Sequence, residues 1–170
     1  NVNGPVTVTG LSSGTTYWFR VYEKNCEGAN TKYYGVTATD NPNSQTTTAC
    51  NAPTTQASSI TFSNVFTDQM TINWTIGNGS TRVVKMNTSN SFTTPADGTD
   101  PSANTVWQNS GEQVIYNGSG NTVTVTGLAS NTTYWYRVYE KNCTGINTKY
   151  FADIATNNPN SQTSGDNPVM

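Results

Sequence analysis

One segment of this sequence occurs twice, and this repeat constrains the fold more than any other feature does. The first copy begins at Val6 and reads VTVTGLSSGTTYWFRVYEKNCEGANTKYYGVTATDNPNSQT. The second begins at Val123 and reads VTVTGLASNTTYWYRVYEKNCTGINTKYFADIATNNPNSQT. The copies are offset by 117 residues, and 31 of the 43 aligned positions that begin at Gly4 are identical. A repeat of this length corresponds to one domain of ordinary size, so the sequence indicates a tandem duplication.

The offset sets the expected domain organisation. Residues 1–48 are expected to hold the C-terminal part of one repeat, and residues 50–163 a complete second repeat. Residues 164–170 are expected to be a linker or the start of a next segment. Because the chain opens on Asn1 within a strand-like pattern, we interpret both ends as cuts in a longer protein.

Composition and periodicity predict an all-β chain. Thr favours strands, whereas the abundant Asn, Ser and Gly favour turns, and no segment carries apolar residues at helical spacing. Met70, Ile72 and Trp74 alternate with polar residues, which is the pattern of a half-buried strand. A polar loop is expected over 88–111. The expected strands of the complete repeat are Ser58–Val65, Met70–Thr75, Arg82–Met86, Gln113–Tyr116, Thr122–Thr126, Thr133–Lys141 and Lys149–Thr156.

Charge and residue content argue against several functions. The net charge is −2 without any basic cluster, and phosphate binding needs clustered Lys and Arg, so we expect no nucleic-acid partner. No apolar stretch reaches about 18 residues, so the chain is not expected to span a membrane. The sequence has no His, which removes Ser-His and Cys-His pairs and His-based metal sites. We therefore expect no enzymatic activity, no catalytic residue and no cofactor.

The spacing of a few apolar residues resembles the signature of the fibronectin type III family. In that family a Trp of strand B, here Trp74, fills the core, and a Leu six residues before a Tyr, here Leu128 and Tyr134, sets the corner between strands E and F. Leu11 and Tyr17 repeat this spacing in the partial copy. The resemblance implies a fibronectin type III-like (immunoglobulin-like) β-sandwich of seven strands, in tandem repeats.

Three further stretches resemble a narrower variant of that family. RVVK at 82–85, PADGT at 95–99 and VIYNG at 114–118 are similar to a fibronectin-like repeat of large surface proteins that bacteria export by type IX secretion. This resemblance implies an extracellular protein, secreted or held at the cell surface, whose partners include the neighbouring repeats of the same chain.

In such a sandwich the partial copy supplies only strands E, F and G. It would lack the strands that cover them, and isolated strands cannot keep apolar side chains exposed. We therefore expect that the first 48 residues are not a self-sufficient domain and that residues upstream of Asn1 complete it. The side chains expected to be exposed are Val6, Val8, Tyr17, Phe19 and Val21.

The three cysteines lie at informative positions. Cys26 and Cys143 are equivalent in the two copies, and Cys50 lies just before the first strand of the complete repeat. In the sandwich that the resemblance implies, the start of strand A and the F–G loop lie at the same pole, so Cys50 can reach Cys143. We predict this disulfide, which leaves Cys26 to pair with a linker cysteine upstream of Asn1. The alternative is three reduced thiols.

The strand expected at 133–141 carries a candidate binding surface. If Tyr134 and Tyr136 face inward, the alternate side chains face outward, and Arg can stack over an aromatic ring. Such a stripe suits contact with a cell-surface glycan or protein, and the alternative is cross-strand packing that covers the sheet. The candidates are Trp135, Arg137, Tyr139 and Lys141, with Trp18, Arg20, Tyr22 and Lys24 at the same positions in the partial copy.

Asp97 and Asp100 are weak candidates for a metal site. Both lie in the Gly- and Pro-containing loop, and carboxylate oxygens can ligate calcium. Two acids without a third nearby make a poor calcium motif, and the alternative is a solvated loop. No other metal ligands are predicted.

Two functional classes fit this pattern. The first is a non-catalytic extracellular repeat module that acts as a stalk or spacer with adhesive capacity. The second is an accessory domain of a large secreted enzyme whose catalytic domain lies outside this fragment. A long array of similar repeats would favour the first, and a neighbouring catalytic domain would establish the second.

Overall fold

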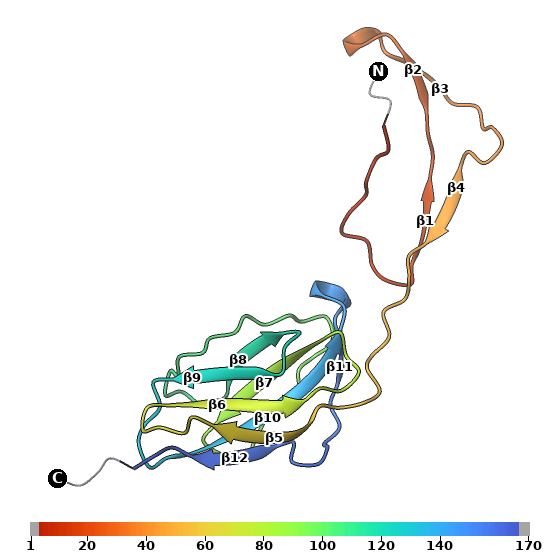
Figure 1. Cartoon of the computed structure of the whole chain (residues 1–170). Helices are drawn as coiled ribbons and strands as arrows, with labels where there is room; N and C mark the ends of the chain where they lie inside the picture. The colour runs from red at the N-terminus through yellow and green to blue at the C-terminus, as the bar shows by residue number, and fades with distance from the viewer. Residues whose placement is uncertain (1–3, 167–170) are drawn as a thin grey trace. The chain divides into compact units, whose positions relative to one another are not determined.

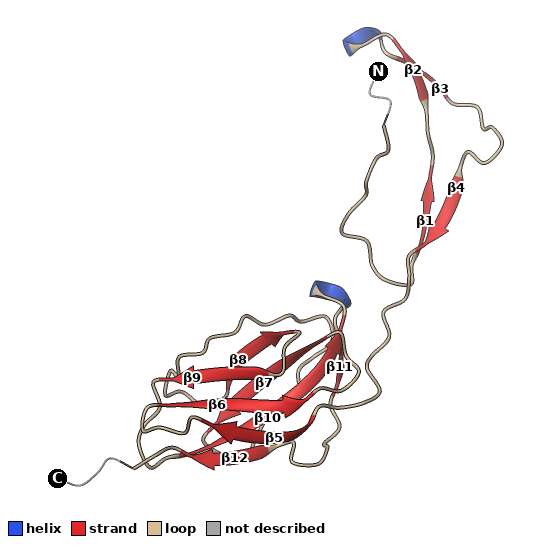
Figure 2. Cartoon of the chain, in the orientation of Figure 1, coloured by secondary structure: helices blue, strands red, loops and turns tan. Residues whose placement is uncertain are grey.

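The computed structural model describes residues 4–166 as β-strands and short 3-10 helices joined by loops and turns (Figures 1 and 2). The chain divides into two compact units, Asn1–Ala49 and Cys50–Met170, called here the first and second units. The expected cut at Asn1 and the end of the expected terminal segment, 167–170, lie outside the described residues.

The second unit is an all-β sandwich of two antiparallel sheets. One sheet has the order β5-β6-β9, and the other has the order β11-β10-β7-β8, with β12 also paired to β10. With β11 and β12 taken as two halves of the last strand, these are sheets A-B-E and G-F-C-C′, which confirms the fibronectin type III-like sandwich. The strands are β5 (Ser58–Ser63), β6 (Gln69–Thr75), β7 (Thr81–Asn87), β8 (Gln113–Gly118), β9 (Thr122–Thr126), β10 (Thr133–Asn142), β11 (Lys149–Phe151) and β12 (Asn160–Thr163).

The core lies between the two sheets. Met70, Ile72 and Trp74 on β6 are buried, as their alternation predicts, and they share one cluster with Leu128 and Tyr134. The predicted placement of Trp74, Leu128 and Tyr134 in a single core is therefore confirmed. The hydroxyl of Tyr134 accepts a hydrogen bond from the Ala129 amide at 2.9 Å, which ties the ring to the corner before β10.

The last strand differs from the prediction. Instead of one strand over Lys149–Thr156, β11 ends at Phe151 and the pairing with β10 resumes only at Asn160. Between them the chain turns through Asn157, which has a φ of +51°, and the Asn158 side chain turns into the domain. Asn158 bonds the amide and the carbonyl of Val138, which replaces ladder hydrogen bonds that the interrupted strand does not make.

The first unit repeats the end of the second but has no core. The pair β1–β4 matches β10–β12, and the pair β2–β3 matches β10–β11. The residues that correspond to β9 form no strand, and no side chain among residues 4–49 is buried. The elements of the first unit are β1 (Thr16–Phe19), β2 (Glu23–Asn25), the 3-10 helix η1 (Gly28–Asn30), β3 (Lys32–Tyr34) and β4 (Asn43–Thr46). In the second unit the 3-10 helix η2 (Gly145–Asn147) corresponds to η1. No helix within residues 4–166 is long enough to cross a membrane.

Candidate functional site

A loop segment crosses the outer face of the β11-β10-β7-β8 sheet. This segment, residues 93–104, is called the strap. Its Asp97 carboxylate lies 2.9 Å from the Lys149 ammonium, and its Asp100 carboxylate lies 2.5 Å from the Lys141 ammonium. At its other side the Lys85 ammonium bonds the Thr93 carbonyl. The strap is thus fixed to β7, β10 and β11 by charged side chains.

Backbone contacts hold the strap as well. The Gly98 amide donates to the Thr148 carbonyl at 2.9 Å, and the Asn104 amide donates to the Val114 carbonyl at 2.9 Å. The Tyr150 hydroxyl donates to a strap carbonyl at 3.1 Å. The expected loop over 88–111 is therefore an ordered cover of the sheet along much of its length.

The two strap carboxylates are held in their charged form. The hydrogen bond from Lys149, followed by that from the Tyr150 amide, lowers the pKa of Asp97 below its ordinary value. The hydrogen bonds from Lys141 and Asn117 lower the pKa of Asp100 in the same way. Both carboxylates are already neutralised by an ammonium group, which disfavours the calcium role considered for them. Among residues 4–166 no three Cys, Asp or Glu side chains gather where they could hold a metal ion.

The strap overturns part of the predicted outward stripe. Tyr139 and Lys141 lie on the outer face as expected, but they are buried there and offer no accessible surface for binding. Tyr139 packs with Val83 and Tyr150 in a second apolar cluster, with the Arg137 guanidinium 4.7 Å from its ring centre. This burial raises the pKa of Tyr139 to about 12. Period-two alternation placed these side chains on the outer face correctly, but it could not show that a loop covers that face.

The remaining stripe residues differ between the two units. Trp135 and Arg137 are half-buried, and Arg137 donates to the Ala152 carbonyl at 2.6 Å. In the first unit, Trp18 and Tyr22 are exposed, with the Arg20 guanidinium 4.7 Å from the Tyr22 ring centre. Lys24 forms an exposed ion pair with Glu27 instead of bonding a strap.

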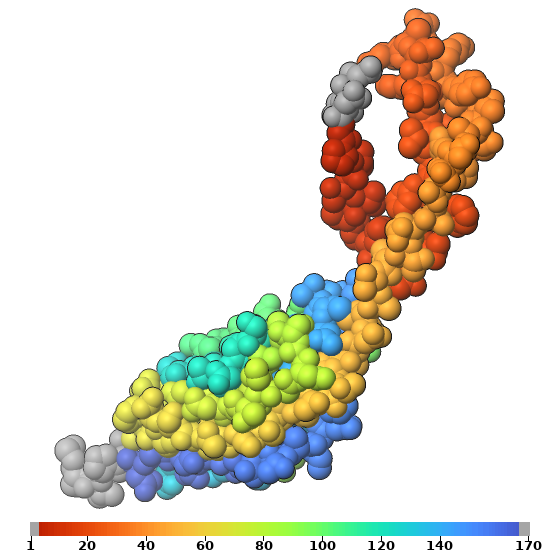
Figure 3. Space-filling model, turned by 45° about the vertical axis from the view of Figure 1, so that its right-hand side comes forward, coloured from red at the N-terminus to blue at the C-terminus, as the bar shows by residue number. Residues whose placement is uncertain are grey.

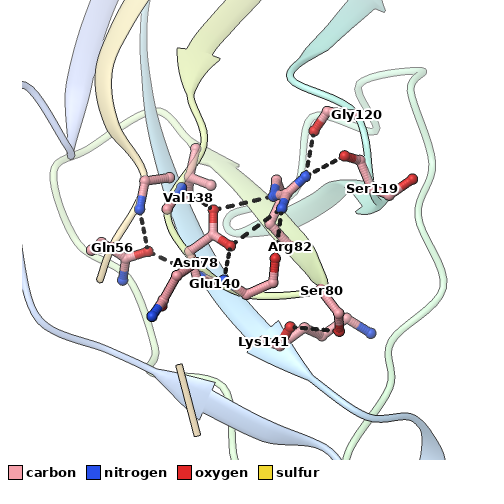
Figure 4. Close-up of polar contacts among 12 residues, drawn as sticks. Gln56, Asn78, Ser80, Arg82, Ser119, Gly120, Val138, Glu140 and Lys141 are labelled. Atoms are coloured by element: carbon pink, nitrogen blue, oxygen red, sulfur yellow. Dashed lines mark hydrogen bonds and ion pairs between the residues drawn. The ribbon is translucent and has the colours of Figure 1, made fainter. Parts of the chain in front are cut away.

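Sequence reasoning missed a buried ion pair. Figure 4 shows Arg82 of β7 against Glu140 of β10, with Nε 3.1 Å from Oε1. Glu140 also accepts the amides of Gly77 at 2.9 Å and Gly79 at 3.0 Å, so both of its oxygens are used. Arg82 donates further to the carbonyls of Gly79, Ser119 and Gly120. The pair joins the turn before β7 and the turn after β8 to the centre of the sheet.

A glutamine extends this network to the start of the domain. The side-chain oxygen of Gln56 accepts the Glu140 amide at 2.9 Å (Figure 4). The side-chain nitrogen of Gln56 donates to the Phe151 and Asp153 carbonyls. Gln56 is itself buried. The network therefore links the segment before β5 to β10 and to the residues after β11.

A disulfide fixes the same end of the sandwich. The structure joins Cys50 to Cys143, with the two Cα atoms 6.4 Å apart, and the bond closes a sequence separation of 93 residues. Cys26 is free and exposed.

Two hollows occur in the first unit. One has a volume of about 440 Å³ and is bordered by apolar residues that include Val6, Val8, Phe19 and Val21. The other, of about 230 Å³, is polar and lies along β2 and β3. The polar hollow is bordered by the charged side chains of Glu23, Lys24 and Lys32.

Comparisons with known proteins give matches among solved structures only. No family model and no curated protein matches this chain. A computationally redesigned β-sandwich protein is similar at 18% identity, with 67% of this chain and 93% of that chain covered and a TM-score of 0.43. The sixth fibronectin type III domain of human fibronectin type III domain containing protein 3 is 13% identical, with 74% and 95% covered and a TM-score of 0.41. Titin domains A168–A170 are 13% identical, with 89% and 55% covered and a TM-score of 0.46.

The second unit is thus a fibronectin type III-like β-sandwich, a class defined here by its strand order and by its corner tyrosine.

Proposed function

We propose that this chain is part of a non-catalytic extracellular repeat protein in which each repeat acts as a stalk or spacer and offers an adhesive surface. The observation that carries the proposal is that charged side chains of the second unit pair with one another inside the domain. Four cationic side chains of the second unit pair with carboxylates of the same domain, between 27 and 58 residues away in the sequence. The pairs are Arg82–Glu140, Lys85–Glu112, Lys141–Asp100 and Lys149–Asp97.

Each of these pairs joins segments of the second unit that are distant in the sequence. Arg82–Glu140 joins two central strands, and the Lys141 and Lys149 pairs hold the strap against the sheet. A catalytic site instead needs charged groups that remain free to meet a substrate. The arrangement supports a domain whose task is to keep its shape.

Two further features support an extracellular stalk. The disulfide between Cys50 and Cys143 suits an oxidising compartment, because thiols are kept reduced in the cytosol. Repetition with an offset of 117 residues suits a protein that needs length, or many weak contacts that add up to avidity.

The adhesive surface is placed at Trp135 and Arg137. Both remain partly accessible on β10, whereas Tyr139 and Lys141 are covered. An indole beside a guanidinium suits a sugar ring or a peptide side chain. Loss of glycan or cell-surface binding in Trp135→Ala, with the thermal midpoint of the second unit unchanged, would support this placement. Unchanged binding would remove it.

Single-molecule stretching tests the spacer role. When the chain is pulled by its ends, we expect the second unit to unfold in one step while the disulfide withholds the residues between Cys50 and Cys143. Added reductant should then release about 320 Å more, at about 3.4 Å for each of the 93 residues. Gradual extension at low force without a discrete step would contradict the spacer role. A measured turnover of any substrate by the chain would contradict the non-catalytic role.

A further inference from the structure

Trp135 differs from the two other tryptophans of the second unit. Trp74 and Trp107 are buried and each contacts a tyrosine ring edge-on, whereas Trp135 is half-buried (the second unit is seen in space-filling form in Figure 3). The residues directly opposite Trp135 on the neighbouring strands are Asn87 of β7 and Ser161 of β12. This indole is therefore flanked by residues with amide and hydroxyl groups, not by apolar side chains.

Arg137 differs from the other cations of the second unit in having no carboxylate partner. The five cations are Arg82, Lys85, Arg137, Lys141 and Lys149. The other four form ion pairs with carboxylates of the same domain. Arg137 forms no ion pair with any residue in the range 4–166, and its guanidinium donates instead to the Ala152 carbonyl at 2.6 Å. One positive charge of this domain is thus left without a counter-charge.

The position of Lys85 makes the missing counter-charge more significant. Lys85 lies directly opposite Arg137 in the β7–β10 ladder, and like charges at opposed positions destabilise a sheet. The Glu112 carboxylate lies 2.6 Å from the Lys85 ammonium, and its second oxygen accepts the Thr93 amide at 2.6 Å. Glu112 therefore neutralises Lys85. An anion bound at Arg137 would neutralise the second of the two opposed charges.

The guanidinium of Arg137 is held in place by the protein itself. Its central carbon lies 4.7 Å from the ring centre of Tyr139, which is buried, and one of its terminal nitrogens bonds the Ala152 carbonyl. A guanidinium has five N–H donors in a planar fork, and the bond to Ala152 uses one of them. The remaining donors suit the two oxygens of a carboxylate. Because the side chain is already ordered, binding an anion there costs less conformational entropy.

We propose that Trp135 and Arg137 together bind a glycan that carries carboxylate groups. The two residues are two positions apart on β10, so their side chains lie on the same face, about 6.7 Å apart along the strand. The sugar ring packs on the indole, and its carboxylate accepts hydrogen bonds from the guanidinium. The polar residues Asn87 and Ser161 suit the hydroxyl groups of a sugar better than the apolar side chains of a peptide. This inference rests on the proposed adhesive function, and it adds the charge and the class of the ligand.

Binding of acidic and neutral glycans to the full chain tests the class of ligand. The probes are oligosaccharides of polygalacturonic acid and of hyaluronan, each compared with its carboxyl-reduced product, which keeps the sugar rings but has no charge. Calorimetry at low salt should give at least one acidic probe a Kd at least about tenfold below that of its reduced product, the equivalent of about 1.4 kcal/mol. Equal Kd values for both pairs, or no binding of either acidic probe, would overturn the proposal.

Substitutions separate recognition of the carboxylate from contact with the sugar ring. Arg137→Gln should weaken binding of the acidic probe by about tenfold or more and leave binding of the reduced probe unchanged. Arg137→Lys keeps the charge but loses the planar fork, so it should restore only part of the affinity. Trp135→Ala should weaken binding of both probes. The matched control is Lys32→Gln, which removes the same charge from an exposed position of the first unit and should leave both Kd values unchanged. An equal loss in this control would overturn the proposal.

A measurement on the unsubstituted chain guards against misfolding of the variants. In NMR spectra the indole N–H signal of Trp135 should shift when the acidic probe is added, whereas those of Trp74 and Trp107 should not. A Trp135 signal that does not move would overturn the proposal, as would binding of poly-glutamate as tightly as the acidic glycan, which would indicate an acidic peptide.

Failure of this inference can be distinguished from failure of the adhesive role. Equal binding of acidic and reduced probes, lost in Trp135→Ala, would overturn the carboxylate specificity and leave the adhesive role intact. Unchanged binding of the acidic probe in Trp135→Ala would contradict both, because neither would then involve this indole.

Discussion

Arg82 and Glu140 face each other inside the sandwich, 3.1 Å apart, with side chains that are 2% and 0% exposed. Removing one partner of a buried pair leaves an uncompensated charge, which is far more costly than the loss of an exposed pair. The first unit supplies a natural control, because Glu23 is the equivalent of Glu140 and is exposed.

The pair predicts unequal effects of one substitution at two equivalent positions. Glu140→Gln should lower the free energy of unfolding of the second unit by about 3–5 kcal/mol, because Arg82 would stay buried without its carboxylate. Glu23→Gln should change it by less than about 0.5 kcal/mol. Urea denaturation followed by tryptophan fluorescence measures both. Similar small effects at the two positions would show that the ion pair does not stabilise the domain.

The burial of Tyr139 gives a second matched comparison. Tyr139→Ala should destabilise the second unit by about 3–5 kcal/mol, because it opens a cavity between Val83 and Tyr150. Tyr22→Ala, at the equivalent exposed position, should leave the thermal midpoint within about 1 °C. Calorimetry distinguishes the two. A Tyr139→Ala protein as stable as the wild type would mean that this ring is not buried in solution.

Acid should loosen the strap. The pKa values of Asp97 and Asp100 are lower in the folded protein than their ordinary value of 3.8. Their ionised forms therefore stabilise the folded state above about pH 3.8, and this contribution is lost as the pH falls below that value through the folded pKa values. The Gly98 amide donates to the Thr148 carbonyl, and its protection from hydrogen exchange, relative to an unfolded amide at the same pH, should decrease over that range.

The matched control for the acid effect is Asp97→Asn with Asp100→Asn. These amides cannot titrate, so exchange of the Gly98 amide should already be fast at neutral pH and should respond little to acid. An acid response of equal size in this variant would assign the effect to other carboxylates.

The disulfide predicts a stability difference between two thiol substitutions. Replacing Cys50 and Cys143 together by Ser should lower the free energy of unfolding by about 4–5 kcal/mol, on the chain-entropy estimate for a loop closed over 93 residues. Cys26→Ser should have no effect on the second unit, because this thiol is exposed in the other unit. Chemical denaturation without reductant measures both, and equal stabilities would show that the bond is absent in solution.

The sequence predicted the sandwich because its signals are local. The alternation from Met70 to Trp74 places one face of a strand in the core whatever the partner strands are. The Leu128 and Tyr134 spacing marks a corner within seven residues of chain. Strand Thr122–Thr126 was predicted with the bounds that the structure shows.

The candidate site was less accessible to sequence reasoning, because it depends on residues that are distant in the chain. Alternation puts Tyr139 on the outer face of its sheet, but only the fold carries the strap across that face. In the sequence, Asp97 and Asp100 have the surroundings of solvated loop carboxylates. Only the fold brings Lys149 and Lys141 beside them.

By itself, the sequence determined the size of the repeat, the all-β class and which side chains point into the core. These properties follow from periodicity and duplication, which can be observed without knowing the fold. The tertiary structure alone decided which charges are buried. Arg82 and Glu140 are 58 positions apart in the sequence. Each charge can be buried only where the fold places the other beside it. The first unit shows the same dependence in reverse: Glu23 lies in a nearly identical local sequence but remains exposed, because the segment that would cover it is not beside it.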